Sequence, residues 1–312
     1  MQEKTLKLTE SLFVARGRQR ECYVHPDDPD LCIKVTVQTR SKWREQNPRE
    51  FKYYKLLEQR GIDWNRIAPC SGWVKTDKGQ GLVFGLIRDR NGQICKNLQF
   101  LIDNNILTNE EIEFELTCLR NWLLDNAIIV CDLKPANIVY NPDNDPGHRL
   151  VLVDGVNNRD FIKTADFVKS LARNKIKRVW KRFEHKHLQD KISISDFEWF
   201  FNPNVACDSA FFSFLKQHVD SSLKEDLSRR HQLEYHDYND KGYVFKRFSP
   251  SDNSDISRKV ELSIKSYIIS GAQRSFRGAT WLQEADIPSI TPVAWAVIGK
   301  GYRQVSYFVY EK

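Results

Sequence analysis

The 312-residue sequence contains no run that approaches the roughly 18 apolar residues of a membrane-spanning helix. Its first seven residues, 1–7, lack the apolar core of a secretory signal. Its seven cysteines are odd in number and form no Cys-x-x-Cys pair, which argues against both a disulfide framework and a zinc site. We therefore expect a cytoplasmic protein with reduced thiols.

Zinc-finger spacings, aromatic ribonucleoprotein motifs and short tandem repeats are also missing. Hydrophobic residues make up 41% of the chain and charged residues 29%, which is typical of a globular protein, and the length favours two units. The net charge of +7 favours anionic partners such as nucleotides, phosphorylated sugars or acidic lipid headgroups. Nucleic acid is the least favoured partner, because no recognition motif accompanies the charge.

The most informative segments are residues 130–140 and 150–155. The first contains Asp132, Lys134 and Asn137 at offsets 0, +2 and +5. In protein kinases this order supplies the catalytic base, a phosphate contact and a metal ligand. The segment therefore predicts the catalytic loop of a phosphotransferase.

Two short apolar runs, 137–140 and 150–153, flank a cluster of turn-forming residues and predict a hairpin. The hairpin would bring Asn137 and Asp154 to one end, where two oxygen ligands could share a magnesium ion. Taken singly, Asp-Leu-Lys-Pro could be an ordinary helix-to-turn junction, and Asp154-Gly155 a common turn. Their order, with a hairpin between them, favours a kinase-like fold.

Upstream, two predicted strands, 12–16 and 21–24, flank a turn that could cover nucleotide phosphates. The turn has one glycine, Gly17, where protein kinases have three. Nearby arginine side chains would add charge to the few backbone donors. A basic surface hairpin is an equally good interpretation. The arginines are Arg16, Arg18 and Arg20.

The next predicted strand, 31–35, carries Lys34, which parallels the kinase lysine that holds the α- and β-phosphates. A helix is predicted to begin with Asn47 as N-cap and Pro48 at its first position. Glu50 in this helix is the candidate partner of Lys34. It also stands three residues past Asn47, where a capping-box carboxylate would lie, so both interpretations stay open.

Residues 81–87 predict the strand that leads into a hinge between two lobes. Phe84 in this strand either lines an adenine pocket or belongs to the core. After Asp154 there is no Ala-Pro-Glu and no long activation segment. Instead, residues 165–188 predict basic helices, which face either solvent or an anionic surface such as the inner membrane.

Five segments together carry a resemblance to a known family. They are residues 16–26, 32–34, 52–54, 133–137 and 179–183. They resemble the PhoP regulatory network protein YrbL family over residues 8–188. The resemblance implies a small bacterial protein-kinase-like protein linked to envelope and magnesium-responsive regulation.

Residues 191–233 are rich in aromatic side chains and predict a helical connector. Residues 234–312 then repeat the earlier pattern, with a strand carrying Lys246, a helical stretch to about Glu284 and two further strands. They predict a second kinase N-lobe that lacks a C-lobe. We expect a truncated product of a longer gene, a degenerate regulatory lobe or half of a site completed by another chain.

Three segments of this second unit resemble the lipopolysaccharide core heptose and Kdo kinases. They are residues 272–279, 285–288 and 306–311. The likeness is confined to the N-lobe of those enzymes, and Lys246 matches their nucleotide-binding lysine. The partner glutamate of Lys246 cannot be placed from the sequence.

These observations predict an α+β protein with a two-lobed, kinase-like domain over 1–190, a connector over 191–233 and a second, incomplete N-lobe over 234–312. We expect it to use ATP and Mg²⁺ to phosphorylate a sugar or lipopolysaccharide-related hydroxyl. The alternative is a non-catalytic nucleotide sensor that acts through a protein partner or the inner membrane surface. The expected catalytic residues are Asp132 and Lys134, the nucleotide-binding residues Lys34, Glu50, Gly17, Arg18 and Phe84, and the metal ligands Asn137 and Asp154.

Overall fold

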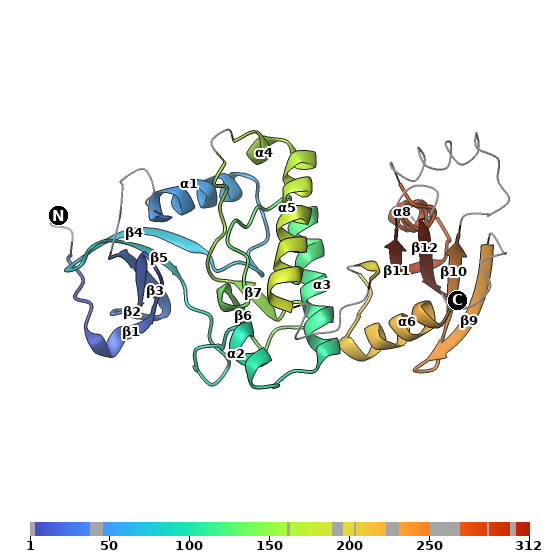
Figure 1. Cartoon of the computed structure of the whole chain (residues 1–312), viewed down its shortest axis with the longest axis horizontal. Helices are drawn as coiled ribbons and strands as arrows, with labels where there is room; N and C mark the ends of the chain where they lie inside the picture. The colour runs from blue at the N-terminus through green and yellow to red at the C-terminus, as the bar shows by residue number, and fades with distance from the viewer. Residues whose placement is uncertain are drawn as a thin grey trace. The chain divides into compact units, whose positions relative to one another are not determined.

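The computed structural model divides the chain into two compact units, whose elements Figure 1 shows coloured along the chain. Unit 1 comprises Met1–Thr108 and Leu119–Ile192, and unit 2 comprises Asn109–Cys118 and Ser193–Lys312. Helix α3 (Asn109–Asp125) therefore contributes to both units. The structure describes residues 4–37, 46–160, 163–188, 196–202, 204–222, 231–249, 269–285, 287–299 and 304–312.

Unit 1 begins with a five-stranded antiparallel sheet in the order β1-β2-β3-β5-β4. One helix, α1 (Gln46–Gln59), lies between β3 and β4 in the chain. The strand–turn–strand predicted at 12–24 is confirmed, as are the next two predicted strands. The strands are β1 (Phe13–Arg16), β2 (Arg20–His25), β3 (Asp28–Thr36), β4 (Cys70–Thr76) and β5 (Gly79–Gly85).

Side-chain alternation gives this sheet two faces, and one of them carries a compact apolar cluster. Tyr23, Ile33, Val35 and Val83 are all buried and pack together on the apolar face. Lys34 stands between Ile33 and Val35 and therefore points to the opposite face, because successive side chains of a strand alternate. The local sequence thus places one lysine on the face opposite this apolar cluster.

Helix α1 begins, within the described residues, at Gln46. Asn47 therefore lies inside the first turn and is not the N-cap that the sequence predicted. Gly61 follows the helix with a φ of +62°, a left-handed conformation that glycine adopts without strain. The buried apolar face of the helix consists of Tyr53, Tyr54 and Leu57.

The hairpin predicted after the catalytic loop is confirmed. β6 (Ile138–Tyr140) and β7 (Leu150–Leu152) are antiparallel, with Ile138 opposite Leu152.

No helix in the described part of the chain is both long and apolar enough to cross a membrane. The other helices of unit 1 are α2 (Leu98–Asp103), α4 (Thr164–Phe167) and α5 (Lys169–Phe183).

Unit 2 contains a second antiparallel sheet, in the order β8-β11-β12-β10-β9. The expectation of a helical connector over 191–233 is corrected in part. Residues 209–222 do form a helix, but residues 198–201 form strand β8 at one edge of this sheet and pair with β11. The elements are β8 (Glu198–Phe201), α6 (Ser209–Ser222), β9 (His231–Tyr238), β10 (Lys241–Phe248), α8 (Gly271–Glu284), β11 (Thr291–Ile298) and β12 (Val305–Glu311).

Aromatic side chains explain why this segment belongs to unit 2. Trp199 of β8 and Phe212 of α6 are almost inaccessible, and their rings meet edge to face at 5.6 Å. Phe212 also lies 5.9 Å from the ring of Phe114 in α3. The aromatic residues that looked too apolar for a linker therefore form the core of this unit.

The two sheets share a strand order. In unit 1 four neighbours run β2-β3-β5-β4, and in unit 2 four neighbours run β9-β10-β12-β11. In both units a helix follows the second of these strands in the chain, with α1 between β3 and β4 and α8 between β10 and β11. Unit 2 thus repeats the topology of the first sheet.

Candidate active site

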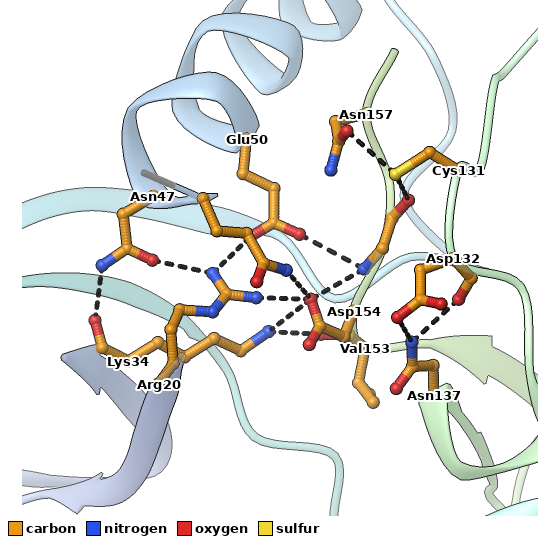
Figure 2. Close-up of polar contacts among 12 residues, drawn as sticks. Arg20, Lys34, Asn47, Glu50, Cys131, Asp132, Asn137, Val153, Asp154 and Asn157 are labelled. Carbon is orange, nitrogen blue, oxygen red and sulfur yellow. Dashed lines mark hydrogen bonds and ion pairs between the residues drawn. The ribbon is translucent and has the colours of Figure 1, made fainter. Parts of the chain in front are cut away.

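The predicted catalytic loop forms a tight turn ahead of β6. Asn137 Nδ2 donates to the backbone oxygen of Asp132 at 2.8 Å and lies 3.3 Å from its carboxylate Oδ2 (Figure 2). Lys134 Nζ lies 3.2 Å from the same carboxylate oxygen. Asn137 is buried. The side chains of Asp132 and Lys134 are 42% and 41% exposed, so Asp132 and Lys134 can both contact a ligand.

The Asp154-Gly155 turn lies against this loop because of a glycine. Cys131 N donates to Gly155 O at 2.9 Å. Gly155 has a φ of +81°, and a Cβ at this position would lie 2.8 Å from the backbone oxygen of Asp132. Both the conformation and the space exclude other residues. The close approach therefore holds Asp132 and Asp154 in one site.

Lys34 reaches the same turn from the sheet. Its Nζ donates to Val153 O at 2.5 Å and lies 3.9 Å from Asp154 Oδ1. The ammonium group also lies 4.3 Å from the centre of the Phe84 ring, a favourable cation–π contact. Phe84 is 1% exposed and is therefore a core residue, on the same face of the sheet as Lys34.

The structure gives Glu50 a different partner from the predicted one. Arg20 Nη1 lies 2.5 Å from Glu50 Oε2, and Arg20 Nη2 donates to Asp154 Oδ1 (Figure 2). No ion pair joins Lys34 to Glu50 in the described part of the chain, because the guanidinium group of Arg20 occupies that carboxylate. The second carboxylate oxygen, Oε1, accepts from Gly155 N at 3.3 Å, so the capping-box interpretation is also corrected.

Arg20, Lys34, Glu50 and Asp154 form one group of two cations and two carboxylates, the four-charge cluster. Burial raises the pKa of Glu50, against the opposing effect of Arg20. Burial also acts to raise the pKa of Asp154, but Lys34 and Arg20 outweigh it and hold this pKa well below its usual range. Burial acts to lower the pKa of Arg20, but the two carboxylates outweigh it and raise that pKa.

Two amides from the start of α1 complete the cluster. Asn47 accepts from Arg20 Nη1 at 2.7 Å and donates to the backbone oxygen of Lys34 at 2.8 Å. Gln46 Nε2 donates to Asp154 Oδ1 at 3.0 Å. Sequence reasoning missed Gln46 and expected Arg20 to face phosphates. The place of Arg20 on the Lys34 face of the sheet is the signal that could have identified its role.

The other predicted phosphate-binding residues lie at the tip of the first hairpin. Gly17 N donates to the backbone oxygen of Arg20 at 2.8 Å, which closes the turn between β1 and β2. Gly17 and Arg18 are exposed, and Arg16 pairs with Glu21 at 3.2 Å. Gly17 contacts only the backbone of Arg20 among the described residues of the four-charge cluster. No described hydrogen bond or ion pair joins the Arg18 side chain to this cluster, although Arg20 belongs to the same hairpin.

The donor set at the hairpin suits Mg²⁺. Val153 N donates to Asn137 O at 3.0 Å, which sets the amide of Asn137 beside the turn that carries Asp154. Mg²⁺ prefers oxygen ligands and is commonly held by one or two carboxylates together with phosphate oxygens. The guanidinium group of Arg20 already forms an ion pair with the Asp154 carboxylate. In the described residues no group of three or more His, Cys, Asp or Glu side chains gathers as a metal site, so phosphate would have to complete the coordination.

The second candidate lysine has different surroundings. Lys246 lies in β10, opposite Phe308 and Leu233 in the neighbouring strands. It is half-buried, and its Nζ lies 5.3 Å from the centre of the Phe248 ring. The acidic residue of α8 is Glu284, at the end of the helix, so α8 offers no counterpart of Glu50.

The five-stranded sheet with one helix leads into a lobe whose loop and hairpin carry Asp132, Asn137 and Asp154. Together, this element order and these side chains define a protein-kinase-like domain of the α+β class.

The chain belongs to the PhoP regulatory network protein YrbL family, whose family model matches residues 6–188. The YrbL proteins of Escherichia coli (strain K12) and Shigella flexneri, both described as uncharacterized, are each 32% identical over 183 residues, which cover 57% of this chain and 86% of theirs.

Two solved structures are also similar. A chain of the Chaetomium thermophilum CAK complex bound to ATP-gamma-S is 22% identical, with a TM-score of 0.36 over 48% of this chain and 46% of its own. The Mycobacterium tuberculosis PknI kinase domain is 15% identical, with a TM-score of 0.35 over 47% of this chain and 59% of its own.

Proposed function

We propose that unit 1 binds ATP with Mg²⁺ and transfers the γ-phosphoryl group to a hydroxyl. The convergence of three segments carries this proposal. β3 supplies Lys34, the loop ahead of β6 supplies Asp132 and Asn137, and the turn after β7 supplies Asp154. These are the groups that phosphoryl transfer requires for positioning and for charge stabilisation.

Each group has a distinct role in this proposal. Lys34 would hold the phosphates, and Asn137 and Asp154 would hold the metal ion, which neutralises charge on the phosphates when bound. Asp132 would accept the proton of the attacking hydroxyl, because its carboxylate is accessible and oriented by Asn137. Lys134, 3.2 Å from that carboxylate, would offset the charge that develops on the transferred group.

A sugar or lipopolysaccharide-related hydroxyl is the acceptor that we propose. A long activation segment, which would bind an extended peptide, has no room here, because helix α4 begins at Thr164 soon after Asp154. The shared topology of unit 2, and its resemblance to core-sugar kinases, favour an acceptor from the same chemical class.

Calorimetry with ATP, with and without MgCl₂, tests the proposal on the full chain. We expect binding that depends on Mg²⁺ in the wild type and weakens in Asp154→Ala. Glu284→Ala, at the end of α8, is a matched control that removes a carboxylate from unit 2 and should bind like the wild type. Absence of ATP binding in the wild type would contradict the proposal. Mg²⁺-dependent binding would justify a screen of heptose and Kdo acceptors for ADP release.

A second candidate is a nucleotide-binding regulatory protein that docks on an anionic membrane surface. The α4–α5 junction exposes three apolar side chains, Phe167 at 76%, Val168 at 45% and Leu171 at 45%. The solvent-facing side of α5 that follows is basic. Apolar side chains beside basic ones suit the interface of an anionic bilayer. The exposed basic residues of α5 are Lys169, Arg173, Lys177, Arg178, Lys181 and Arg182.

Co-sedimentation with phosphatidylglycerol vesicles tests this second candidate. We expect the wild type to bind these vesicles but not phosphatidylcholine vesicles, and expect the double variant Phe167→Ser/Leu171→Ser to lose binding. Ile106→Ser, which removes another exposed apolar side chain of unit 1, is the control and should bind normally. Equal binding to both kinds of vesicle would contradict an electrostatic docking surface.

A further inference from the structure

The carboxylate of Asp154 has an asymmetric environment. Arg20 Nη2, Gln46 Nε2 at 3.0 Å and Gly155 N at 2.7 Å all donate to Oδ1. Lys34 Nζ lies 3.9 Å from the same oxygen. Within the described residues Oδ2 receives no hydrogen bond or ion pair, although 32% of the Asp154 side chain is exposed. One oxygen is therefore engaged by protein donors, and the other is open.

The cluster around Asp154 is also balanced in formal charge. Arg20 and Lys34 contribute two positive charges, and Glu50 and Asp154 contribute two negative charges. Arg20 and Glu50 are buried, with side-chain exposures of 6% and 1%. A divalent cation that arrived alone would add two positive charges to a neutral, largely dry group, where unlike and like charges interact far more strongly than in water.

We propose that Arg20 is a built-in counter-ion that neutralises Asp154 in the nucleotide-free protein, so that Mg²⁺ enters this site only together with the nucleotide. The inference rests on the proposed function of unit 1. The phosphates of ATP bring the negative charge that the metal requires, and they can draw Lys34 away from Val153 and Asp154. Arg20 stays on Oδ1 and Glu50 and acts as a positioning residue, leaving Oδ2 for the metal.

Titration of the nucleotide-free full chain with MgCl₂, by calorimetry and by thermal unfolding, tests this inference. We expect the wild type to show neither heat of binding nor a shift in Tm at millimolar MgCl₂. Arg20→Gln removes one positive charge, and we expect it to bind Mg²⁺ alone about tenfold or more tightly than the wild type, with a Tm that rises with MgCl₂. Arg16→Gln, which removes an exposed arginine from the same hairpin, should behave like the wild type.

Two further variants separate charge from shape. Arg20→Lys keeps the positive charge, so we expect no response to MgCl₂ alone. Arg20→Gln/Asp154→Asn should lose the response that Arg20→Gln gains, because the metal-binding carboxylate is gone. A response to MgCl₂ in Arg20→Lys equal to that in Arg20→Gln would overturn the counter-ion role.

The wild type alone can also overturn the inference, even if Arg20→Gln does not fold. Tight binding of MgCl₂ to the nucleotide-free wild type would show that the charge of Arg20 does not prevent the metal from binding alone. The two proposals fail in different experiments. Absence of ATP binding refutes the proposed function, whereas ATP binding combined with unchanged MgCl₂ titrations in Arg20→Gln refutes only the role of Arg20.

Discussion

Units 1 and 2 have the same order of four strands and a helix at the same place in the chain, yet their central lysines differ. Lys34 in unit 1 contacts Val153 and Asp154, whereas the Nζ of Lys246 in unit 2 lies 5.3 Å from the centre of the Phe248 ring. The difference lies in carboxylates that come from other segments, which the sheet itself cannot supply. Shared topology therefore places a lysine, but the neighbouring acids decide whether it belongs to a charged site.

The largest expected effect is loss of turnover from Asp132→Ala. No described residue of unit 2 has been identified as a counterpart of this base, so the variant separates the units most sharply. We expect ADP release to fall by about 10²–10⁴-fold, the typical contribution of a general base. Calorimetric ATP affinity should persist, because no described hydrogen bond or ion pair joins the Asp132 side chain to Lys34 or Asp154. Retained turnover would remove Asp132 from the role of base.

The matched pair Lys34→Met and Lys246→Met tests the comparison of the two lysines. Lys34→Met should weaken ATP binding by about 10–100-fold, since a charge-assisted hydrogen bond contributes roughly 1.5–3 kcal/mol. Lys246→Met should leave both the affinity and a stoichiometry of one ATP per chain unchanged. Calorimetry gives both quantities, and a second site lost in Lys246→Met would make the units functionally alike.

Two glycine substitutions are expected to change stability in opposite directions. Gly155→Ala places a Cβ 2.8 Å from Asp132 O at a φ of +81°, so we expect a loss of about 1–3 kcal/mol. Gly278→Ala lies in the exposed interior of α8 with nothing within 4 Å of the added Cβ, so we expect a gain of about 0.5–1 kcal/mol. Denaturant unfolding measures both changes. A neutral Gly155→Ala would contradict the close approach of the two loops.

The smallest expected effect concerns pH. Burial and His236 lower the pKa of His218 in α6 below 6.5, so unit 2 should lose stability as the pH falls below that value, where the unfolded chain gains the proton first. Burial acts to raise the pKa of Asp154, but Lys34 and Arg20 hold it below 3.8, so the stability that Asp154 gives unit 1 should be lost only below that value.

Thermal unfolding between about pH 7 and about pH 3 checks both effects. The upper window is the pH range just below 6.5, where His218 acts, and the lower window is the range below 3.8, where Asp154 acts. His218→Gln should flatten the change in Tm in the upper window and leave the lower window intact. Asp154→Asn should do the reverse. A single transition that shifts in only one window would show that the two units do not respond to pH separately.

Local patterns predicted the elements of unit 1 that carry the catalytic loop. Turn-forming residues between two apolar runs predicted the hairpin, and β6 and β7 confirm it. The pairing of Glu50 was beyond the sequence, because Arg20 and Lys34 share one face of the sheet and both can reach α1. Which cation takes the carboxylate depends on side-chain reach and on the position of Asp154, both of which are tertiary properties.

The short strand β8 shows a second limit of sequence reasoning. Its four residues are mostly aromatic, and periodicity cannot distinguish a short apolar strand from a buried helical turn. The edge of the second sheet decides the outcome, because β11 offers unpaired backbone groups to residues 198–201. Pairing across the sheet thus overrides the helical preference expected for the segment.

The charge balance of the four-charge cluster has a consequence for kinetics. A neutral buried group exerts little pull beyond its own contacts, so long-range attraction of a polyanion must come from exposed charges such as Arg16 and Arg18 at the hairpin tip. Salt screens such exposed charges over about 8 Å at physiological ionic strength, but it screens buried contacts far less. Higher ionic strength should therefore lower the association rate of a nucleotide while leaving its dissociation rate nearly unchanged.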